Sequence, residues 1–125
     1  MDPFEVTEVS IAGLREALEG SRVSSVQLVE SYLRRIQAYD RTGPTLNSVV
    51  VPNGAALAEA AASDQRRSRG ELLGPLDGIP YTAKDSYLAN GLTAAAGSHA
   101  FEHLIATTDA FAIERLRGGG ACRTS

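Results

Sequence analysis

The sequence has few or none of several residue types, and each scarcity excludes some classes of function. Its 125 residues include one cysteine, no tryptophan and a single lysine, Lys84, beside eleven arginines. The lone Cys122 excludes an internal disulfide and suits a reducing compartment. No apolar run is long enough to cross a membrane, and the acidic start at Met1–Glu5 lacks the apolar core of a signal peptide. A net charge of −3 argues against general nucleic-acid affinity. We therefore expect a cytoplasmic protein that binds neither membranes nor nucleic acids.

The order of predicted elements indicates an α/β domain. Helical spacing and caps predict helices over residues 10–20, 24–40, 54–69 and 109–117, and two short runs at 47–51 and 79–84 predict strands. Hydrophobic residues make up 43% of the chain, which is enough for one modest core. Helices that alternate with strands are typical of helices layered on a sheet.

Local signals predict where the helices begin and end. Ser24 and Gln27 have the spacing of a capping box at the start of the second helix. Gly70 is the expected C-cap of the third helix, whose last turn carries arginines that we expect to face water and complement the helix dipole. Thr108 is the expected cap of the final helix.

The chain is organised around Leu73–Ser86, the segment that holds the only lysine. Gly74-Pro75, Asp77-Gly78 and Pro80 are turn signals, and the run that follows predicts a strand with Lys84 at its carboxyl end. Ligands and catalytic groups gather at this end of strands in open α/β sheets. The other interpretation is a solvated lysine on the polar face of an edge strand.

The residues of this segment resemble those of a known family. The run from Gly74 to Asp85 is similar to the G-P-L-x-G-I-P-x-x-x-K-D stretch of the amidase-signature family. The resemblance continues through Gly91–Ser98 and through Asp109–Arg117, and it covers residues 72–121, whereas the first seventy residues agree only in helix pattern. It implies the N-terminal part of the amidase-signature fold, with helices packed on a partial mixed sheet.

The resemblance also implies a mechanism in which Lys84 is the base of a Ser–cis-Ser–Lys triad. A serine hydroxyl needs an adjacent base to become nucleophilic, and a lysine in water, with a pKa of about 10.4, stays charged. Burial disfavours the charged form, so this role requires Lys84 to lie out of bulk water. Neither a metal nor an organic cofactor is expected in such hydrolysis of a small-molecule amide.

The two family serines lie in a Gly/Ser-rich loop that these 125 residues do not contain. Ser86 and Ser98 do not occupy the matching positions. We therefore expect one truncated domain, with an N-terminal helical pair at 1–45, the start of an α/β core at 46–121 and a divergent tail at 122–125. The chain as given is expected to be inactive as an amidase.

Alternatives to the amidase interpretation remain open. The chain is also interpretable as a non-catalytic remnant or interaction module, with the helical pair as a candidate homodimer surface. Within the enzymes, a glutamine-dependent amidotransferase A-type subunit is similar over the same blocks. His99 and His103 have a spacing that suits zinc on a helix, but without a third ligand we interpret them as surface histidines beside an inward-packed Phe101.

Overall fold

The computed structural model describes residues 4–125. The elements are the helices α1 (Ile11–Glu19), α2 (Ser25–Arg35), α3 (Ala56–Arg69) and α4 (Phe111–Gly118), the strands β1 (Pro80–Tyr81) and β2 (Cys122–Arg123), the π-helical segment η1 (Ile36–Arg41) and the 3-10 segment η2 (His99–Phe101). The predicted α/β class is confirmed.

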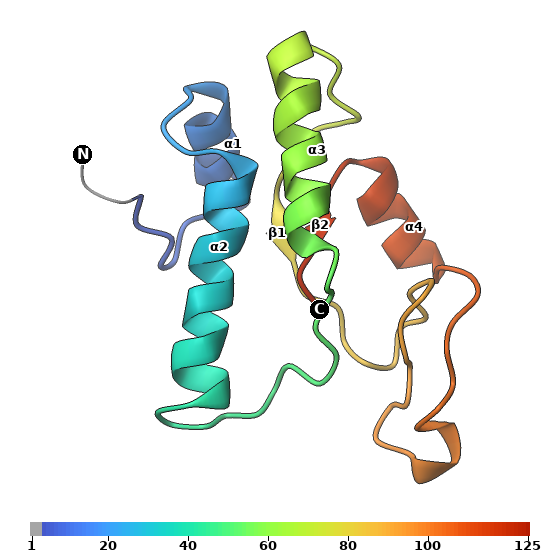
Figure 1. The fold of residues 1–125 in the computed structure, drawn as a ribbon. Helices are drawn as coiled ribbons and strands as arrows, with labels where there is room; N and C mark the ends of the chain where they lie inside the picture. The colour runs from blue at the N-terminus through green and yellow to red at the C-terminus, as the bar shows by residue number, and fades with distance from the viewer. Residues whose placement is uncertain (1–3) are drawn as a thin grey trace.

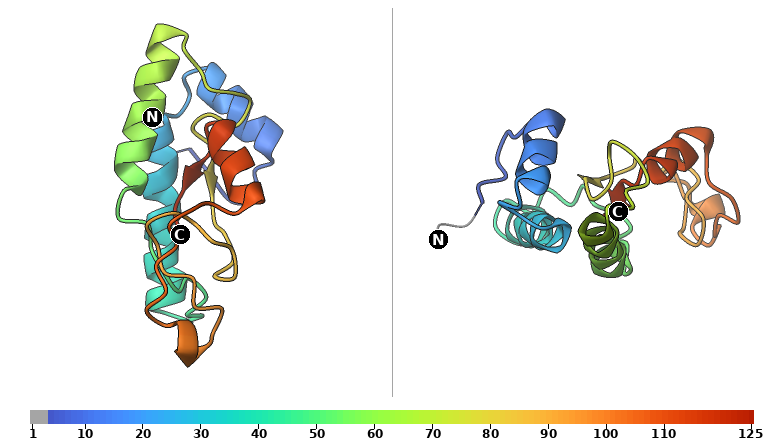
Figure 2. Two further views of the ribbon diagram at one scale, coloured as in Figure 1. Left: turned by 90° about the vertical axis from the view of Figure 1, so that its right-hand side faces the viewer. Right: turned by 90° about the horizontal axis from the view of Figure 1, so that it is seen from above.

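The chain forms three layers (Figures 1 and 2). α2 and α3 lie side by side on one face of a small sheet, and α1 and α4 lie on its other face. The two strands are parallel, with Pro80 opposite Cys122 and Tyr81 opposite Arg123. The expected mixed sheet is therefore, within residues 4–125, a parallel pair, and an isolated antiparallel bridge joins Thr93 to Ile105 outside it.

Most helix ends lie where the sequence predicts them. The Ser24 hydroxyl accepts the N–H of Gln27 at 3.1 Å, and the Gln27 side chain accepts the N–H of Ser24 at 2.9 Å, which completes the capping box. Gly70 ends α3 with a φ of 71°. The prediction for α4 is wrong at its start, because Ala110 and not Thr108 precedes the first turn.

The predicted strand at residues 47–51 does not form. The backbone N–H groups that a strand partner would need are bonded instead to the end of the preceding helix. Asn47 donates to the carbonyl of Asp40 at 3.0 Å, and Ser48 and Val49 donate to the Asp40 carboxylate at 2.6 and 3.2 Å. The segment is consequently a loop that is fixed to η1.

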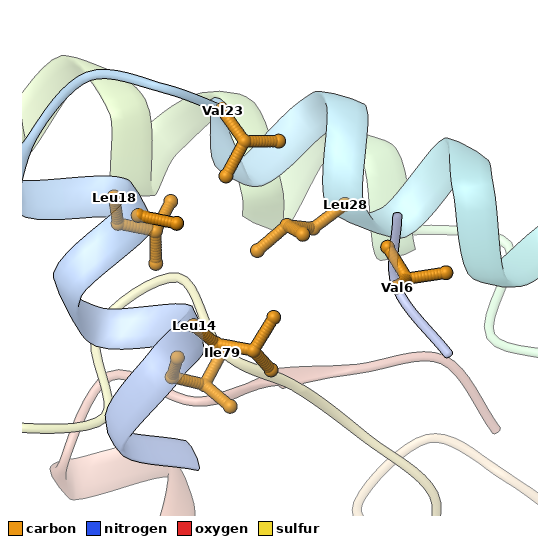
Figure 3. Packing of buried hydrophobic residues seen from close by; sticks show 7 residues of the cluster. Val6, Leu14, Leu18, Val23, Leu28 and Ile79 are labelled. Atoms are coloured by element: carbon orange, nitrogen blue, oxygen red, sulfur yellow. The ribbon is translucent and has the colours of Figure 1, made fainter. Parts of the chain in front are cut away.

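The main core lies between α1, α2 and the chain before β1 (Figure 3). It is built from Val6, Leu14, Leu18, Val23, Leu28 and Ile79 with Ala17. A second cluster joins α2, α3 and β2 through Val29, Ala56, Ala60 and Cys122. The small alanine side chains of α3 allow it to pack closely on α2, so the alanine-rich run has a packing role besides its helix propensity.

In the part of the chain that the structure describes, no helix has both the length and the apolar character needed to span a bilayer.

Candidate active-site cleft

A cleft of about 500 Å³ opens at the carboxyl ends of the two strands. One wall is the loop at residues 48–51, and the other is formed by residues 82–85 with Tyr87, Ala89, Leu92 and Thr93. Arg123 and Ser125 also line the cleft, at the end of β2. This is the position at which open α/β sheets bind ligands.

Lys84 lies in this cleft, directly beyond the strand pairing. The ladder continues past β1, because Thr124 donates its N–H to Tyr81 at 2.9 Å and Ala83 donates its N–H to Ser125 at 3.2 Å. The next residue is Lys84, which is exposed and lines the cleft. Within residues 4–125 its ammonium group has neither an ion-pair partner nor a hydrogen bond. The placement at a strand end is as expected, whereas the expected shelter from water is absent from this chain on its own.

The Asp40 carboxylate fixes the first wall of the cleft. It accepts hydrogen bonds from the N–H and the hydroxyl of Ser48 and from the N–H of Val49, and Asp40 is only 4% exposed. The bonds from Ser48 and then the bond from Val49 lower the pKa of Asp40, against the opposing effect of burial. The carboxylate is therefore held in its charged, accepting form, and the wall is tied to the end of η1.

Asn53 joins the same wall to β2. Its side-chain amide donates to the carbonyl of Arg123 at 2.8 Å and to Glu59 at 3.1 Å, and its backbone N–H donates to Thr124 at 3.0 Å. Asn53 thus takes the place of a neighbouring strand along the outer edge of β2. The cleft consequently has two anchored sides, although its sheet has no more than two strands within residues 4–125.

Asp77 organises the turn that leads into β1. Arg66 from α3 donates to both oxygens of its carboxylate at 2.8 and 2.9 Å, and Leu73 donates its N–H at 2.8 Å. The Ser63 hydroxyl donates to the same group. Burial by itself would raise the pKa of Asp77, but the bonds from Arg66, Leu73 and Ser63 outweigh it and lower the pKa.

The arginine cluster at the end of α3 is therefore not the solvated group that we expected. Arg66 pairs with Asp77, and Arg67 donates to the carbonyl of the same residue at 2.7 Å, whereas Arg69 is exposed. The prediction fails for two of the three arginines because Asp77 accepts from both, through its buried carboxylate for Arg66 and through its backbone carbonyl for Arg67. This contact fixes the segment that carries β1 and Lys84 on α3.

Two glycines allow the backbone around Asp77 to pack closely. A Cβ at Gly120, whose φ is +88°, would lie 2.6 Å from Cα of Asp77. A Cβ at Gly78, with a φ of +85°, would lie 2.8 Å from the hydroxyl of Ser63. No side chain fits at either position, so the Asp-Gly turn and the chain before β2 lie against each other at backbone distance.

The long segment after Lys84 is a folded-back loop that completes the second wall. Gly91 donates its N–H to Ala106 at 2.8 Å, Ala106 donates to Leu92 at 2.9 Å, and Ala94 donates to Leu104 at 3.0 Å. Thr93 and Leu92 face the cleft, while the small-residue stretch that follows lies outside its lining. Thr93 is therefore part of the wall beside the site, whereas the residues at 94–98 are not.

The remaining polar residues singled out in the sequence lie away from the cleft. His99 and His103 are fully exposed beside Glu102, and the described residues contain no cluster of His, Cys, Asp and Glu suited to a metal. Ser98 caps η2 by accepting the N–H of Ala100 at 3.3 Å, and Ser86 is exposed. Phe101 does not pack inward as expected, since it is 53% exposed.

Sequence reasoning missed Arg123 as a residue of the cleft. Arg123 is 4% exposed, and its Nε and Nη1 atoms are buried without a hydrogen-bond partner within residues 4–125. An arginine after a run of small or apolar residues, Gly120-Ala121-Cys122, is the only signal that pointed to it. It brings a second cation into the cleft that holds Lys84.

An apolar groove of about 520 Å³ lies on the other side of β1, between α1 and α4. Ile11 and Leu14 line it from α1, Leu116 from α4, and Pro80 from the strand. The view from above in Figure 2 shows α1 and α4 standing apart over this face of the sheet. The groove leaves part of the sheet face uncovered.

The fold places this chain among the α/β proteins that have a cleft at the carboxyl ends of parallel strands. Residues 27–124 match the Amidase family, which is more than half of the chain, and the chain belongs to that family. The match extends at both ends past residues 72–121, the range in which sequence motifs carry the resemblance.

Known relatives and solved structures agree with this assignment. The chain is 42% identical over 113 residues to the A-type subunit of the glutamyl-tRNA(Gln) amidotransferase of Thioalkalivibrio sulfidiphilus (strain HL-EbGR7), covering 90% of this chain and 23% of that protein. The native peptide amidase of Stenotrophomonas maltophilia superposes with a TM-score of 0.92 at 40% identity, covering 98% of this chain and 25% of that one. An amidase family protein of Bacillus anthracis str. Ames gives a TM-score of 0.88 at 33% identity, covering 96% of this chain and 24% of that one. The chain therefore spans about a quarter of the length of these relatives.

Proposed function

We propose that this chain supplies the general base, Lys84, to a site that hydrolyses carboxylic amides through an acyl-serine intermediate. The observation that carries the proposal is the position of Lys84, the only lysine, immediately after the β1–β2 pairing and inside the strand-end cleft. Membership of the Amidase family supports the same assignment.

The chemistry assigns Lys84 one task. Its neutral amine takes a proton that is relayed from the nucleophilic serine through a second serine, and the serine oxygen then attacks the amide carbonyl. As the tetrahedral intermediate collapses, the C–N bond breaks and the proton passes to the departing amine. Water then cleaves the acyl-serine ester, which releases the carboxylic acid and restores the serine hydroxyl.

Because Lys84 is exposed in this chain, the proposed site also requires a part that shields Lys84 from water. An amine in water stays protonated at neutral pH, and a charged ammonium cannot accept a proton. We propose that the serines and the covering that removes Lys84 from water come from the three-quarters of the relatives' length that this chain does not match. Purified on its own, the 125-residue chain is accordingly expected to release no ammonia from a peptide amide above background.

A chimera tests the role of Lys84. The matching quarter of the Stenotrophomonas maltophilia peptide amidase is replaced by this chain, which superposes on it with a TM-score of 0.92. The chimera is expected to hydrolyse a peptide amide, and Lys84→Ala in it is expected to reduce kcat by about a thousandfold, because a general base contributes about 10² to 10⁴ in rate.

The matched control replaces an exposed cation outside the cleft, Arg69→Ala, and should leave kcat unchanged. Circular dichroism checks that the Lys84→Ala chimera keeps its fold. If Lys84→Ala retains more than about a tenth of the activity of a folded chimera, Lys84 is not the base.

A second candidate function rests on the amidotransferase relatives. The 42% identity to the A-type subunit of a glutamyl-tRNA(Gln) amidotransferase supports a role as the amide-handling part of such an enzyme. The same graft, placed in the Thioalkalivibrio sulfidiphilus protein together with its partner subunits, distinguishes the two candidates. Release of ammonia from glutamine by that graft, with no activity in the peptide amidase chimera, would favour the amidotransferase.

A further inference from the structure

We propose that Asp40 is a positioning residue of the site, which holds the wall at residues 48–51 in place for the apolar part of an amide substrate. The inference rests on the proposed hydrolysis at Lys84 and names a residue that determines KM. The carrying observation is that, within residues 4–125, every hydrogen bond accepted by the Asp40 carboxylate comes from Ser48 or Val49, two residues that line the cleft with Lys84. The role is one of positioning, because Asp40 itself does not line the cleft.

The end of η1 binds both the donors and an acceptor of the wall. The Asp40 side chain is 6% exposed, and its carboxylate accepts the N–H and the hydroxyl of Ser48, each at 2.6 Å, and the N–H of Val49 at 3.2 Å. Arg41, the next residue, donates to the carbonyl of Val49. Hydrogen bonds to a charged acceptor are stronger than neutral ones, so Asp40 is the main attachment of the wall.

The rest of the wall depends on this attachment. Within residues 4–125, Val50 and Val51 form no hydrogen bond, and the next backbone bond along the chain is that of Asn53 to Thr124 at 3.0 Å. Neither of the two hydrophobic clusters includes a residue between 40 and 53. Loss of the Asp40 bonds should therefore displace the wall without opening the core.

The wall offers an apolar surface to a substrate. Its three valines, at 49–51, line the cleft on one side, and Ala89 and Leu92 line it on the other. Val50 is 62% exposed, so its side chain is available to a ligand. A contact that is remote from the breaking bond stabilises the bound substrate and the transition state equally, and it therefore lowers KM without changing kcat.

The test compares two substrates in the chimera with the Stenotrophomonas maltophilia peptide amidase. N-acetyl-leucinamide carries a branched apolar side chain beside the amide, whereas N-acetyl-glycinamide carries none. Asp40→Asn places an NH₂ donor against the N–H of Val49 or of Ser48, and is expected to raise KM for the leucinamide about fivefold. KM for the glycinamide and kcat for both amides should stay within about twofold. An unchanged KM for the leucinamide, an equal rise for both amides, or a decrease in kcat alone would overturn the proposal.

The matched control is Asp64→Asn. Asp64 also accepts two backbone N–H groups, those of Ser25 and Val26 at 2.7 and 3.1 Å, but it lies outside the cleft lining. This substitution should leave KM for both amides unchanged, and a rise equal to that in Asp40→Asn would show a general effect of stability and overturn the proposal. Val50→Ala alters an exposed side chain of the wall and should raise KM for the leucinamide only. It decides alone if Asp40→Asn does not fold.

The test is separable from the role of Lys84 as the base. If Lys84→Ala retains activity, Lys84 is not the base, whereas the comparison of KM values for Asp40→Asn still applies. If the chimera turns over neither amide, the Kd of each amide, measured by calorimetry, replaces KM with the same expected ratios. Absence of binding to the folded chimera would overturn the proposal.

Discussion

The guanidinium of Arg66 binds the carboxylate of Asp77 with two hydrogen bonds, from Nε at 2.9 Å and from Nη2 at 2.8 Å. The side chain of Asp77 is fully buried, while that of Arg66 is 25% exposed. The pair joins the last turns of α3 to the turn that opens β1. It therefore determines where the strand carrying Lys84 begins.

Removal of the Asp77 carboxylate should destabilise the chain strongly. Asp77→Ala leaves Arg66, the N–H of Leu73 and the Ser63 hydroxyl without their acceptor, and breaking a buried pair of this kind costs about 3 kcal/mol. Urea unfolding followed by circular dichroism measures the loss. The control Asp85→Asn alters a carboxylate in the cleft lining and should change the free energy of unfolding by less than about 0.5 kcal/mol. Equal effects of the two substitutions would contradict the role of Asp77.

The same carboxylate should make the stability depend on acid pH. The pKa of Asp77 is lower in the folded chain than its unfolded value of about 3.9, so the unfolded chain binds its proton first as the pH falls. The stabilisation is complete above the unfolded pKa and disappears as the pH falls through the folded pKa. In Asp77→Asn, the free energy of unfolding should therefore decrease less steeply below about pH 4, by up to about 1.4 kcal/mol per pH unit.

Urea titrations of the wild type and Asp77→Asn between about pH 2 and 6 measure these slopes. Asp40 and Asp109 also have lowered pKa values, so some acid sensitivity should remain in the variant. Parallel curves for the two proteins would show that Asp77 does not contribute to the acid response.

Replacement by alanine should destabilise the chain to different degrees at two glycines that have similar backbone angles. Gly120 has a φ of +88° and its added Cβ would meet Asp77 at 2.6 Å, whereas Gly97 has a φ of +75° and no atom within 4 Å of that position. Gly97→Ala carries only the backbone penalty of about 1 kcal/mol, and Gly120→Ala adds a steric clash, for a total loss of about 3 kcal/mol or more. Thermal unfolding of both variants measures the difference. A similar melting temperature for the two would contradict the close packing at Asp77.

Local sequence signals predicted the helices because the interactions that end them are short in range. The capping box of Ser24 and Gln27 spans three residues, and Gly70 needs only its own φ freedom. The position of Lys84 after a strand was also predictable, since turn residues bracket the run. These parts of the fold depend on neighbours along the chain.

The parts that sequence reasoning missed depend on contacts between distant residues. Asp64 of α3 accepts the N–H groups of Ser25 and Val26 at 2.7 and 3.1 Å, and so caps α2 from 39 and 38 residues away. The loop at 47–51 has the composition of a strand, but Asp40 occupies its N–H groups. The burial of Arg123 likewise follows from tertiary packing, because nothing in its neighbours along the chain places it in the cleft that Lys84 also lines.

The apolar groove between α1 and α4 should make this chain bind hydrophobic dyes. Ile11 is 57% exposed on its rim, and the sheet face below it has no cover within residues 4–125. An exposed apolar patch of this kind binds anilinonaphthalene sulfonate, so the folded chain should enhance the dye's fluorescence at neutral pH.

Ile11→Ser should reduce the enhancement roughly twofold, because it removes apolar contact area from the groove. The matched control Leu57→Ser alters a residue on α3 that is 43% exposed outside the groove, and should leave the enhancement unchanged. Little dye binding by the wild type, together with a sharp cooperative thermal transition, would show that this face is not available to apolar ligands. An equal decrease of the fluorescence enhancement in both variants would show that the dye binds elsewhere.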